Sequence, residues 1–277
     1  PPNDPTALET ASQAIRARFS SEPIPAHLAD ALVKAYAALG CPAVAVRSSA
    51  TAEDLPGLSF AGQQETMLNV VGEQALLRAV IDCWSSLWTA RAIGYRARNG
   101  IDQGSVSLAV VVQEIVASET SGVLFTANPL TGRRAETVID ATLGLGEALV
   151  SGQVEPDQYV VDAAGRIVSK TLGTKALAIH GRAGGGTTTV HADAASQQAL
   201  DDEHILKLAL LGRRSAKLFG TPQDVEWAAA GGRLYLLQSR PITTLYPLPD
   251  GMPAEPLRAM MSFGSVQGVL DPITPLG

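Results

Sequence analysis

The sequence predicts an α+β fold, and three observations favour this class. Residues 73–98 carry apolar side chains at helical spacing, and Asn99-Gly100 ends that pattern. Residues 106–116 form an almost wholly apolar segment, which is expected to be a strand buried on both faces. Residues 224–243 contain two short apolar runs that flank Gly231-Gly232, which is typical of a hairpin.

The remaining elements are expected in chain order around these three. Helices are predicted at residues 7–19, 26–39 and 201–218, with a short one opening at 144–147. Strands are predicted at residues 43–46, 121–127, 137–141, 157–162 and 166–170, the last two as a hairpin. The glycines at 184–186 are interpreted as a flexible loop, because no apolar strand precedes them and no clear helix follows. Residues 245–259 hold four prolines and are interpreted as a linker.

Composition excludes several classes of protein. The 277 residues are 46% hydrophobic and 17% charged, and the net charge of −6 predicts no general attraction to nucleic acid. No apolar run reaches membrane-spanning length. Cys41 and Cys83 are expected to be reduced core residues of a cytoplasmic protein. The four histidines lack ligand spacing and are expected to be surface or structural residues.

The 224–243 hairpin carries three polar residues whose grouping depends on the loop length. An odd-length loop centred on Gly232 would place Glu226 opposite Gln238, with Arg240 on the same face. A two-residue Gly-Gly turn would shift the register by one and split the set. We expect the odd loop, which would present oxygen ligands for Mg²⁺ and a guanidinium for phosphate. Considered alone, the stretch is more typical of a surface hairpin with an incidental charge pair.

Three further stretches are candidates for nucleotide binding. Arg47 and two serines directly follow a strand, an arrangement that suits a phosphate. Gly62 and Thr66 follow a glycine-bearing loop whose backbone amides could approach a phosphate. Residues 113–116 end a strand and could offer main-chain groups to an adenine edge, although an ordinary strand exit would look the same.

Four motifs in order resemble one family. They are V-R-S-S-A-T-A-E-D-L-P-G-L-S-F-A-G-Q-Q-E-T (46–66), S-G-V-L-F-T-A-N-P-L-T-G (121–132), G-L-G-E-A-L-V-S-G (144–152) and Q-S-R-P-I-T-T (238–244). The first, second and fourth resemble the nucleotide-binding domain of phosphoenolpyruvate synthase and pyruvate phosphate dikinase. The third, with the tail at 261–277, is similar to the rifampicin phosphotransferase branch. Four motifs in order are far more specific than any one of them.

The resemblance implies an ATP-grasp-type nucleotide-binding domain whose N-terminal part is incomplete, with ATP and Mg²⁺ as cofactors. Catalytic roles at the phosphates are implied for Arg47 and Arg240, and Mg²⁺ ligation for Glu226 and Gln238. Nucleotide contacts are implied for Arg47, Gly62, Thr66, Gln113, Glu114, Val116 and Arg240. This implication also favours the odd register of the hairpin over an incidental surface pair.

The implied activity is a dikinase-type phosphotransfer, in which ATP, an acceptor and water give AMP, phosphorylated acceptor and phosphate through a phosphohistidine. Residues 1–244 would be the partial nucleotide-binding domain, 245–259 a linker and 260–277 the start of an acceptor-binding domain. The expected partners are ATP, a phosphohistidine domain of the same full-length protein and a small-molecule acceptor, with no nucleic acid and no membrane. The ATP-binding lysine strand is expected before Pro1, so we expect this chain to fold but to bind ATP weakly. The alternatives are a phosphoenolpyruvate synthase acting on pyruvate and a non-catalytic nucleotide-binding module.

Overall fold

The computed structural model describes residues 4–50, 66–245, 248 and 253. The helices are α1 (Pro5–Ser21), α2 (Ala26–Ala38), α3 (Glu73–Ser86), α4 (Ala90–Arg98), α5 (Glu147–Val150) and α6 (Asp202–Phe219). The first strands are β1 (Val44–Ala50), β2 (Thr66–Val70), β3 (Leu108–Glu114), β4 (Thr120–Phe125), β5 (Thr137–Leu143) and β6 (Asp157–Val161). The later strands are β7 (Ile167–Thr171), β8 (Leu177–Gly181), β9 (Thr187–His191), β10 (Gln223–Ala230) and β11 (Arg233–Pro241).

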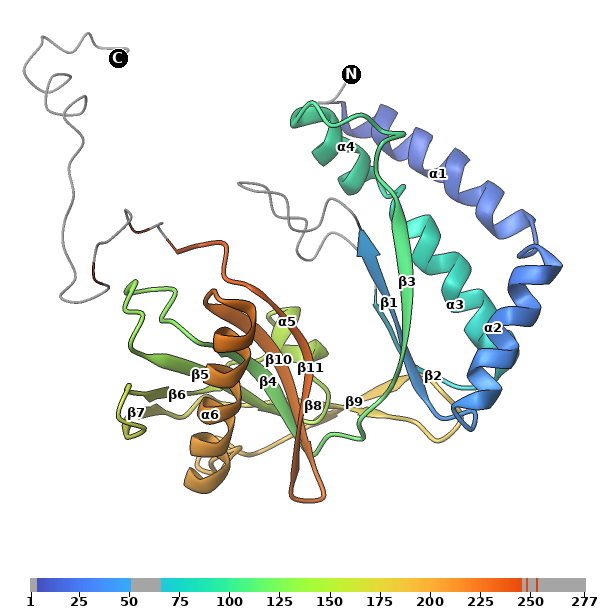
Figure 1. Cartoon of the computed structure of the whole chain (residues 1–277). Coiled ribbons are helices and arrows are strands. Elements are labelled where there is room, and N and C mark those ends of the chain that lie inside the picture. Colours follow the sequence, from blue (N-terminus) through green and yellow to red (C-terminus); the bar gives the residue numbers. More distant parts are fainter. Residues whose placement is uncertain (1–3, 51–65, 246–247, 249–252, 254–277) are drawn as a thin grey trace, which may run out of the picture.

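These elements form two lobes (Figure 1). The first lobe contains α1–α4 around a three-stranded sheet with the order β2-β1-β3. The second lobe contains α5 and α6 with a six-stranded sheet of order β11-β10-β4-β5-β6-β7. The described strand neighbours in both sheets pair antiparallel. The mixture of helices and antiparallel sheets agrees with the α+β class expected from the sequence.

In the first lobe, α2 and α3 cover the sheet around β1. The core joins Tyr36 of α2, the β1 valines and the apolar face of α3. The single helix predicted for residues 73–98 is wrong in one respect, because the structure divides it into α3 and α4. Thr89 lies between them and caps α4, its hydroxyl accepting the Ala92 amide at 3.2 Å. A threonine that satisfies an amide of a new helix lets the chain change direction there.

The prediction that β3 is buried on both faces is also wrong. Its residues alternate between intermediate and exposed positions over most of its length, and Val111 is 46% exposed. A valine-rich run reads the same whether one face or both are covered, so composition could not distinguish the two arrangements. β3 lies at the edge of its sheet, paired only with β1 among the described strands.

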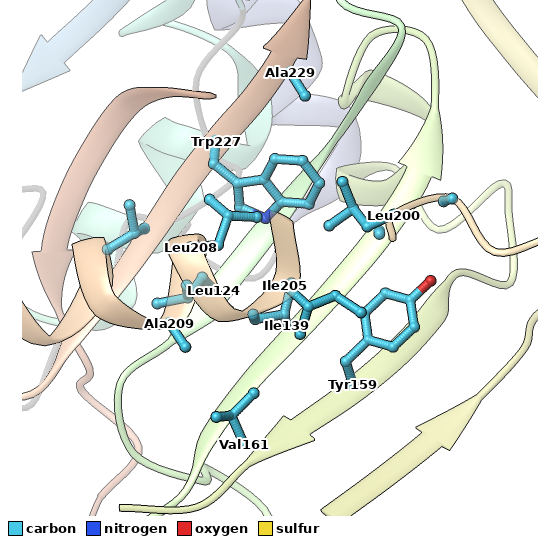
Figure 2. Close-up of a cluster of buried hydrophobic side chains, with 13 residues drawn as sticks. Leu124, Ile139, Tyr159, Val161, Leu200, Ile205, Leu208, Ala209, Trp227 and Ala229 are labelled. Atoms are coloured by element: carbon cyan, nitrogen blue, oxygen red, sulfur yellow. The ribbon is translucent and has the colours of Figure 1, made fainter. Parts of the chain in front are cut away.

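In the second lobe, α6 lies across one face of the six-stranded sheet, and the main core forms between them (Figure 2). Trp227 of β10 and Tyr159 of β6 are fully buried there against Ile205 and Leu208 of α6. Helix and sheet approach so closely that a Cβ on Gly212 would lie 2.4 Å from a Leu124 methyl. Side chains alternate along a strand, so Glu226, next to Trp227, lies on the face away from α6.

The β8–β9 hairpin was not predicted as strands. Gly184–Gly186, interpreted as a flexible loop, form part of the ordered turn between β8 and β9, where the Gly185 amide donates to the Arg182 carbonyl at 3.0 Å. The hairpin extends from the second lobe to the first (Figure 1). Polar threonines in β9 gave no apolar signal from which a strand could be inferred.

Two further expectations concern cysteines and membranes. Cys83 is buried in the first-lobe core as expected, whereas Cys41 is exposed, so the expectation of two core cysteines was wrong for Cys41. None of the helices in the described part of the chain combines the length and apolar character that crossing a bilayer requires.

Candidate functional site

The β10–β11 hairpin places Glu226 directly opposite Gln238 and Asp224 opposite Arg240. The expected register is therefore confirmed, but the expected odd-length loop is wrong. Ala230 and Arg233 face each other across a two-residue turn at Gly231 and Gly232, whose φ angles are +55° and +72°. Both central residues have the positive φ that a two-residue hairpin turn of type I′ requires.

A β-bulge reconciles this turn with the observed register. The pairing shifts by one residue between Glu226 and Trp227, because Leu237 is an extra residue on β11. Without the bulge, a ladder starting from the Gly-Gly turn would place Leu237 opposite Glu226 and turn Gln238 to the other face. The bulge thus returns the polar side chains of both strands to one face.

Arg47 reaches this face from the first lobe. Its Nη2 atom donates to Glu226 Oε2 at 2.5 Å and also to Gln238 Oε1. The Arg47 side chain is 18% exposed and the Glu226 side chain 30% exposed, so water retains access to the contact. A carboxylate oxygen and an amide oxygen from neighbouring strands therefore converge on one position, and that position carries positive charge.

A second ion pair lies beside the first on the same hairpin. Arg240 Nε donates to Asp224 Oδ2 at 2.9 Å. Burial raises the pKa of Asp224, and the charge of Arg240 and its hydrogen bond oppose that shift. Arg240 is thereby held on the same face of the hairpin as Glu226 and Gln238.

Sequence reasoning missed Asp224, although a signal was present. It lies two residues before Glu226, and the period of two along a strand puts both on one face. The bulge at Leu237 carried no comparable signal, since leucine fits a regular strand equally well.

Gln113 forms another contact between the lobes. Its Nε2 atom donates to the carbonyl oxygen of Leu237, the bulge residue, at 3.3 Å. Gln113 lies near the end of β3, just before the segment that leads into β4 of the second lobe. Glu114 ends β3 with an exposed side chain, and Val116 follows, half-buried, its carbonyl accepting the Ser118 amide at 2.7 Å.

The structure brings some of the expected residues together and leaves others apart. Thr66 opens β2 directly opposite Arg47 in the ladder, with an exposed side chain. Glu114 ends β3 and Val116 lies in the connection between the lobes. Neither forms a hydrogen bond or ion pair with Arg47, Glu226 or Gln238 in the described part of the chain. Gly62 lies outside the described residues.

No group of three or more His, Cys, Asp or Glu residues that could hold a metal occurs in the described ranges. The oxygens of Glu226 and Gln238 converge at the hairpin and could both reach one metal ion, with the remaining positions left to other oxygens. Mg²⁺ commonly binds in this way, through one or two protein ligands plus phosphates and water. The donor set thus fits Mg²⁺ bound together with a phosphate.

A separate cavity of about 290 Å³ lies between α1 and α3, lined mainly by apolar side chains that include Phe19, Ile24 and Trp84. It lacks a convergent group of polar atoms, which a site for a charged ligand needs. The contact region between the lobes is therefore the better candidate.

The chain is similar to a known nucleotide-binding family. Residues 1–255 match the family described as "Pyruvate phosphate dikinase, AMP/ATP-binding domain". The chain belongs to this family. Rifampicin phosphotransferase of Streptomyces sviceus is 48% identical over 279 residues, which covers 100% of the chain and 32% of the relative. That of Bacillus subtilis is 51% identical over 237 residues, covering 85% of the chain and 27% of the relative.

Phosphoenolpyruvate synthase of Pyrococcus furiosus is 45% identical over 260 residues, covering 88% of the chain and 32% of the relative. The chain thus spans about a third of the length of these relatives, between 27% and 32%. The resemblance drawn from the four motifs is confirmed. For a dikinase AMP/ATP-binding domain, an adenine nucleotide is the expected ligand, and the interlobe region supplies cationic and oxygen ligands suited to its phosphates.

Proposed function

We propose that the chain is the ATP-binding portion of a dikinase-type phosphotransferase and holds Mg-ATP between its two lobes in the manner of an ATP-grasp domain. The supporting observation is the convergence of Glu226 and Gln238 on a single cationic position supplied by Arg47 of the opposite lobe. Oxygens aimed at one point from two strands, with an arginine alongside, form a set that suits a metal-bound phosphate.

Glu226 and Gln238 would hold the Mg²⁺. Bound there, Mg²⁺ would neutralise the charge that develops on the phosphates during transfer. Arg47 would then direct its guanidinium toward phosphate oxygens, for which its planar fork is suited. The Arg47 and Glu226 side chains are 18% and 30% exposed, so the contact is partly accessible to water and to a ligand.

Arg240 would contact the β- or γ-phosphate. Asp224 fixes this guanidinium through Nε, which orients the remaining donors of the arginine. Thr66 and Gly62 would bind the phosphates from the first lobe, Thr66 being opposite Arg47 in the ladder. Gln113, Glu114 and Val116 would line the adenine side, since they lie in and next to the connection between the lobes.

The complete reaction would convert ATP, acceptor and water to AMP, phosphorylated acceptor and phosphate. The phosphate would pass through a phosphohistidine on a separate domain of the longer protein. We further propose residues 1–244 as the partial nucleotide-binding domain, 245–259 as a linker and 260–277 as the start of an acceptor-binding domain, in a cytoplasmic protein.

For the acceptor, a rifamycin is the first candidate and pyruvate the second. The ground for this order is the third motif and the tail at 261–277, which resemble the rifampicin phosphotransferase branch. Coverage does not rank the two, since the matches to rifampicin phosphotransferases cover 100% and 85% of the chain and the match to a phosphoenolpyruvate synthase covers 88%. The test incubates a longer protein carrying this domain with Mg-ATP and either rifampicin or pyruvate. AMP and phosphate formed with rifampicin support the proposal, and formation with pyruvate only supports the synthase. ATP binding without AMP formation in either case would favour a non-catalytic module.

A further inference from the structure

The β8–β9 hairpin, here called the strap (residues 177–191), contacts both lobes. Its base lies on the second lobe, where the Leu145 amide donates to the Ile179 carbonyl at 2.8 Å and Gly144 forms a parallel bridge with Ile179. Its turn reaches the first lobe at Asn69 of β2 (Figure 1). The strap is thus a connection between the lobes separate from the Arg47 contact and from the β3–β4 segment.

Asn69 receives the turn of the strap with three hydrogen bonds. Its Nδ2 atom donates to the carbonyl of Arg182 at 2.8 Å and to that of Gly186 at 2.6 Å. The Gly186 amide donates in return to the Asn69 carbonyl at 2.8 Å. Both hydrogens of the amide nitrogen are thereby used, and the Asn69 residue is only 5% exposed.

The backbone of β2 is shaped for this contact. Asn69 has a φ of +55°, and the β1–β2 pairing shifts by one residue at this point. Asparagine tolerates the left-handed region better than most residues, and a bulge redirects a side chain out of the regular ladder. A bulge here directs the amide away from the first-lobe sheet and toward the strap.

The strap is fitted closely to this side chain. A Cβ on Gly181 would lie between 3.0 and 3.1 Å from the Asn69 side-chain amide atoms, so a larger residue would displace it. Gly184, in the same turn, has open space around the equivalent position. Next to Asn69, Leu68 packs against a cluster that contains Leu145 of the second lobe and Ile179 of the strap.

The legs of the strap are also fixed. Lys175, two residues before β8, forms a fully buried ion pair with Asp157 at the start of β6. After β9, the Ala199 amide donates to the other oxygen of Asp157 at 2.7 Å. One carboxylate therefore ties the chain on both sides of the strap, which is held at its base and at its turn.

We propose that the strap sets the relative orientation of the two lobes, with Asn69 as the positioning residue that keeps Arg47 in reach of Glu226 and Gln238. Asn69 and Arg47 belong to paired strands of one small sheet, so a rotation of that sheet about the strap would move both together. The consequence for nucleotide binding rests on the proposed function, whereas the consequence for lobe orientation does not.

The test compares three variants with a matched control. Asn69→Asp keeps the shape but sets a carboxylate against two carbonyl oxygens, and Asn69→Gly removes the side chain while tolerating the positive φ. Gly181→Ala displaces the Asn69 amide, whereas Gly184→Ala in the same turn meets no atom and serves as the control.

The first readout needs no nucleotide. One spin label is placed on the exposed Cys41 of the first lobe and another on Ser169→Cys, an exposed position in β7 of the second lobe. Pulsed electron resonance then gives the distribution of distances between the lobes. We expect a single narrow distribution in the parent and Gly184→Ala, and a broadened or shifted one in the other three variants.

The second readout is Mg-ATP affinity by titration calorimetry. Loss of one or two hydrogen bonds corresponds to about a tenfold change, so Kd should rise about tenfold in Asn69→Asp and remain at the parent value in Gly184→Ala. An unchanged distance distribution in the Asn69 variants, with only a lower melting temperature, would overturn the strap proposal. A changed distribution in a chain that binds no Mg-ATP would leave the strap standing and contradict the proposed function instead.

Discussion

Two ion pairs in the molecule, Lys175 with Asp157 and Arg47 with Glu226, differ in burial and in what they connect. Asp157 and Lys175 have side chains with 0% exposure. Lys175 donates to Asp157 and to the Gly173 carbonyl, and Asp157 also accepts from Gly173, Tyr159 and Ala199. A buried pair stabilises a fold only when its remaining hydrogen-bonding capacity is filled, as it is here.

The pair of Arg47 and Glu226 is different in each of these respects. It is partly exposed to water, joins two lobes rather than two neighbouring segments, and shares its guanidinium with Gln238. A phosphate that replaced Glu226 beside Arg47 would keep an anionic partner for the guanidinium, whereas loss of Asp157 would leave Lys175 as an unpaired buried charge. We infer that the buried pair of Asp157 and Lys175, here called the sealed pair, stabilises the fold. The partly exposed pair of Arg47 and Glu226, here called the open pair, is available to a ligand.

The largest effect is expected from a substitution that breaks the sealed pair. Asp157→Ala leaves Lys175 as an unpaired buried cation and removes the acceptor of three other groups, so we expect the free energy of unfolding to fall by about 3–5 kcal/mol. Urea unfolding followed by circular dichroism measures it.

The control for that variant is Asp202→Ala, which breaks the exposed pair with Lys170 in the same lobe. We expect little change there, because exposed pairs contribute little. Equal losses in the two variants would show that burial is not what distinguishes them.

The next effect breaks the open pair. Glu226→Ala should leave the free energy of unfolding nearly unchanged. In a longer protein carrying this domain, it should reduce Mg²⁺-dependent AMP formation by a factor on the order of 10² to 10³, because the Mg²⁺ that neutralises the phosphates loses its carboxylate ligand. Glu119→Ala, which removes an exposed carboxylate at the turn of the same hairpin, is the control and should retain turnover. Near-normal turnover of Glu226→Ala would contradict the assignment.

A smaller effect is expected from a substitution of Arg47, and it tests whether this arginine contacts the nucleotide. Arg47→Lys keeps the charge but loses the planar fork, so we expect turnover to fall about tenfold with little change in the melting temperature. Steady-state kinetics as a function of ATP concentration measures it. If the variant equals the parent in both KM and kcat, Arg47 serves the contact between the lobes and not the nucleotide.

The smallest effect concerns pH. Burial raises the pKa of Asp140, and a hydrogen bond from Gln158 at 3.0 Å opposes the shift. A raised carboxyl pKa contributes stability that is present below the unfolded pKa of about 3.9 and lost as pH rises through the folded pKa. Asp140→Asn removes this loss, so its free energy of unfolding relative to the parent should increase between about pH 4 and pH 7.

Asp162→Asn is the control of opposite sign. The backbone amide and side chain of Arg166 lower the pKa of Asp162, so this carboxylate stabilises the parent above its unfolded pKa. The free energy of unfolding of the variant, relative to the parent, should therefore decrease as pH rises. Urea unfolding at a series of pH values measures both differences. The same trend in the two variants would contradict the assigned causes.

Part of this account was predictable from the sequence. The α+β class and the pairing of Glu226 with Gln238 were predicted, because alternation along strands and glycine at a turn leave direct sequence signals. The turn itself was predicted wrongly, since a bulge at Leu237 and a longer loop give the same register. Local sequence does not distinguish these two solutions, because what fixes the register is the pairing with β4 and the buried face of Trp227.

Contacts between segments distant in the chain were beyond prediction. The contact between Asn69 and the turn at residues 182–186 joins segments more than a hundred positions apart, at intervals of 113 and 117 residues. Nothing in the composition of either segment indicates the other. The tie between Asp157 and Lys175 likewise depends on the path of the strap, which the polar β9 sequence concealed.

The most direct test of the central claim is titration calorimetry of ATP against the chain with and without Mg²⁺, using the parent, Glu226→Ala and Gln238→Ala. We expect Mg²⁺ to strengthen ATP binding in the parent and this gain to disappear in both variants, while metal-free ATP binding changes little. A gain from Mg²⁺ that persists in full in both variants would contradict the claim that these two oxygens hold the metal.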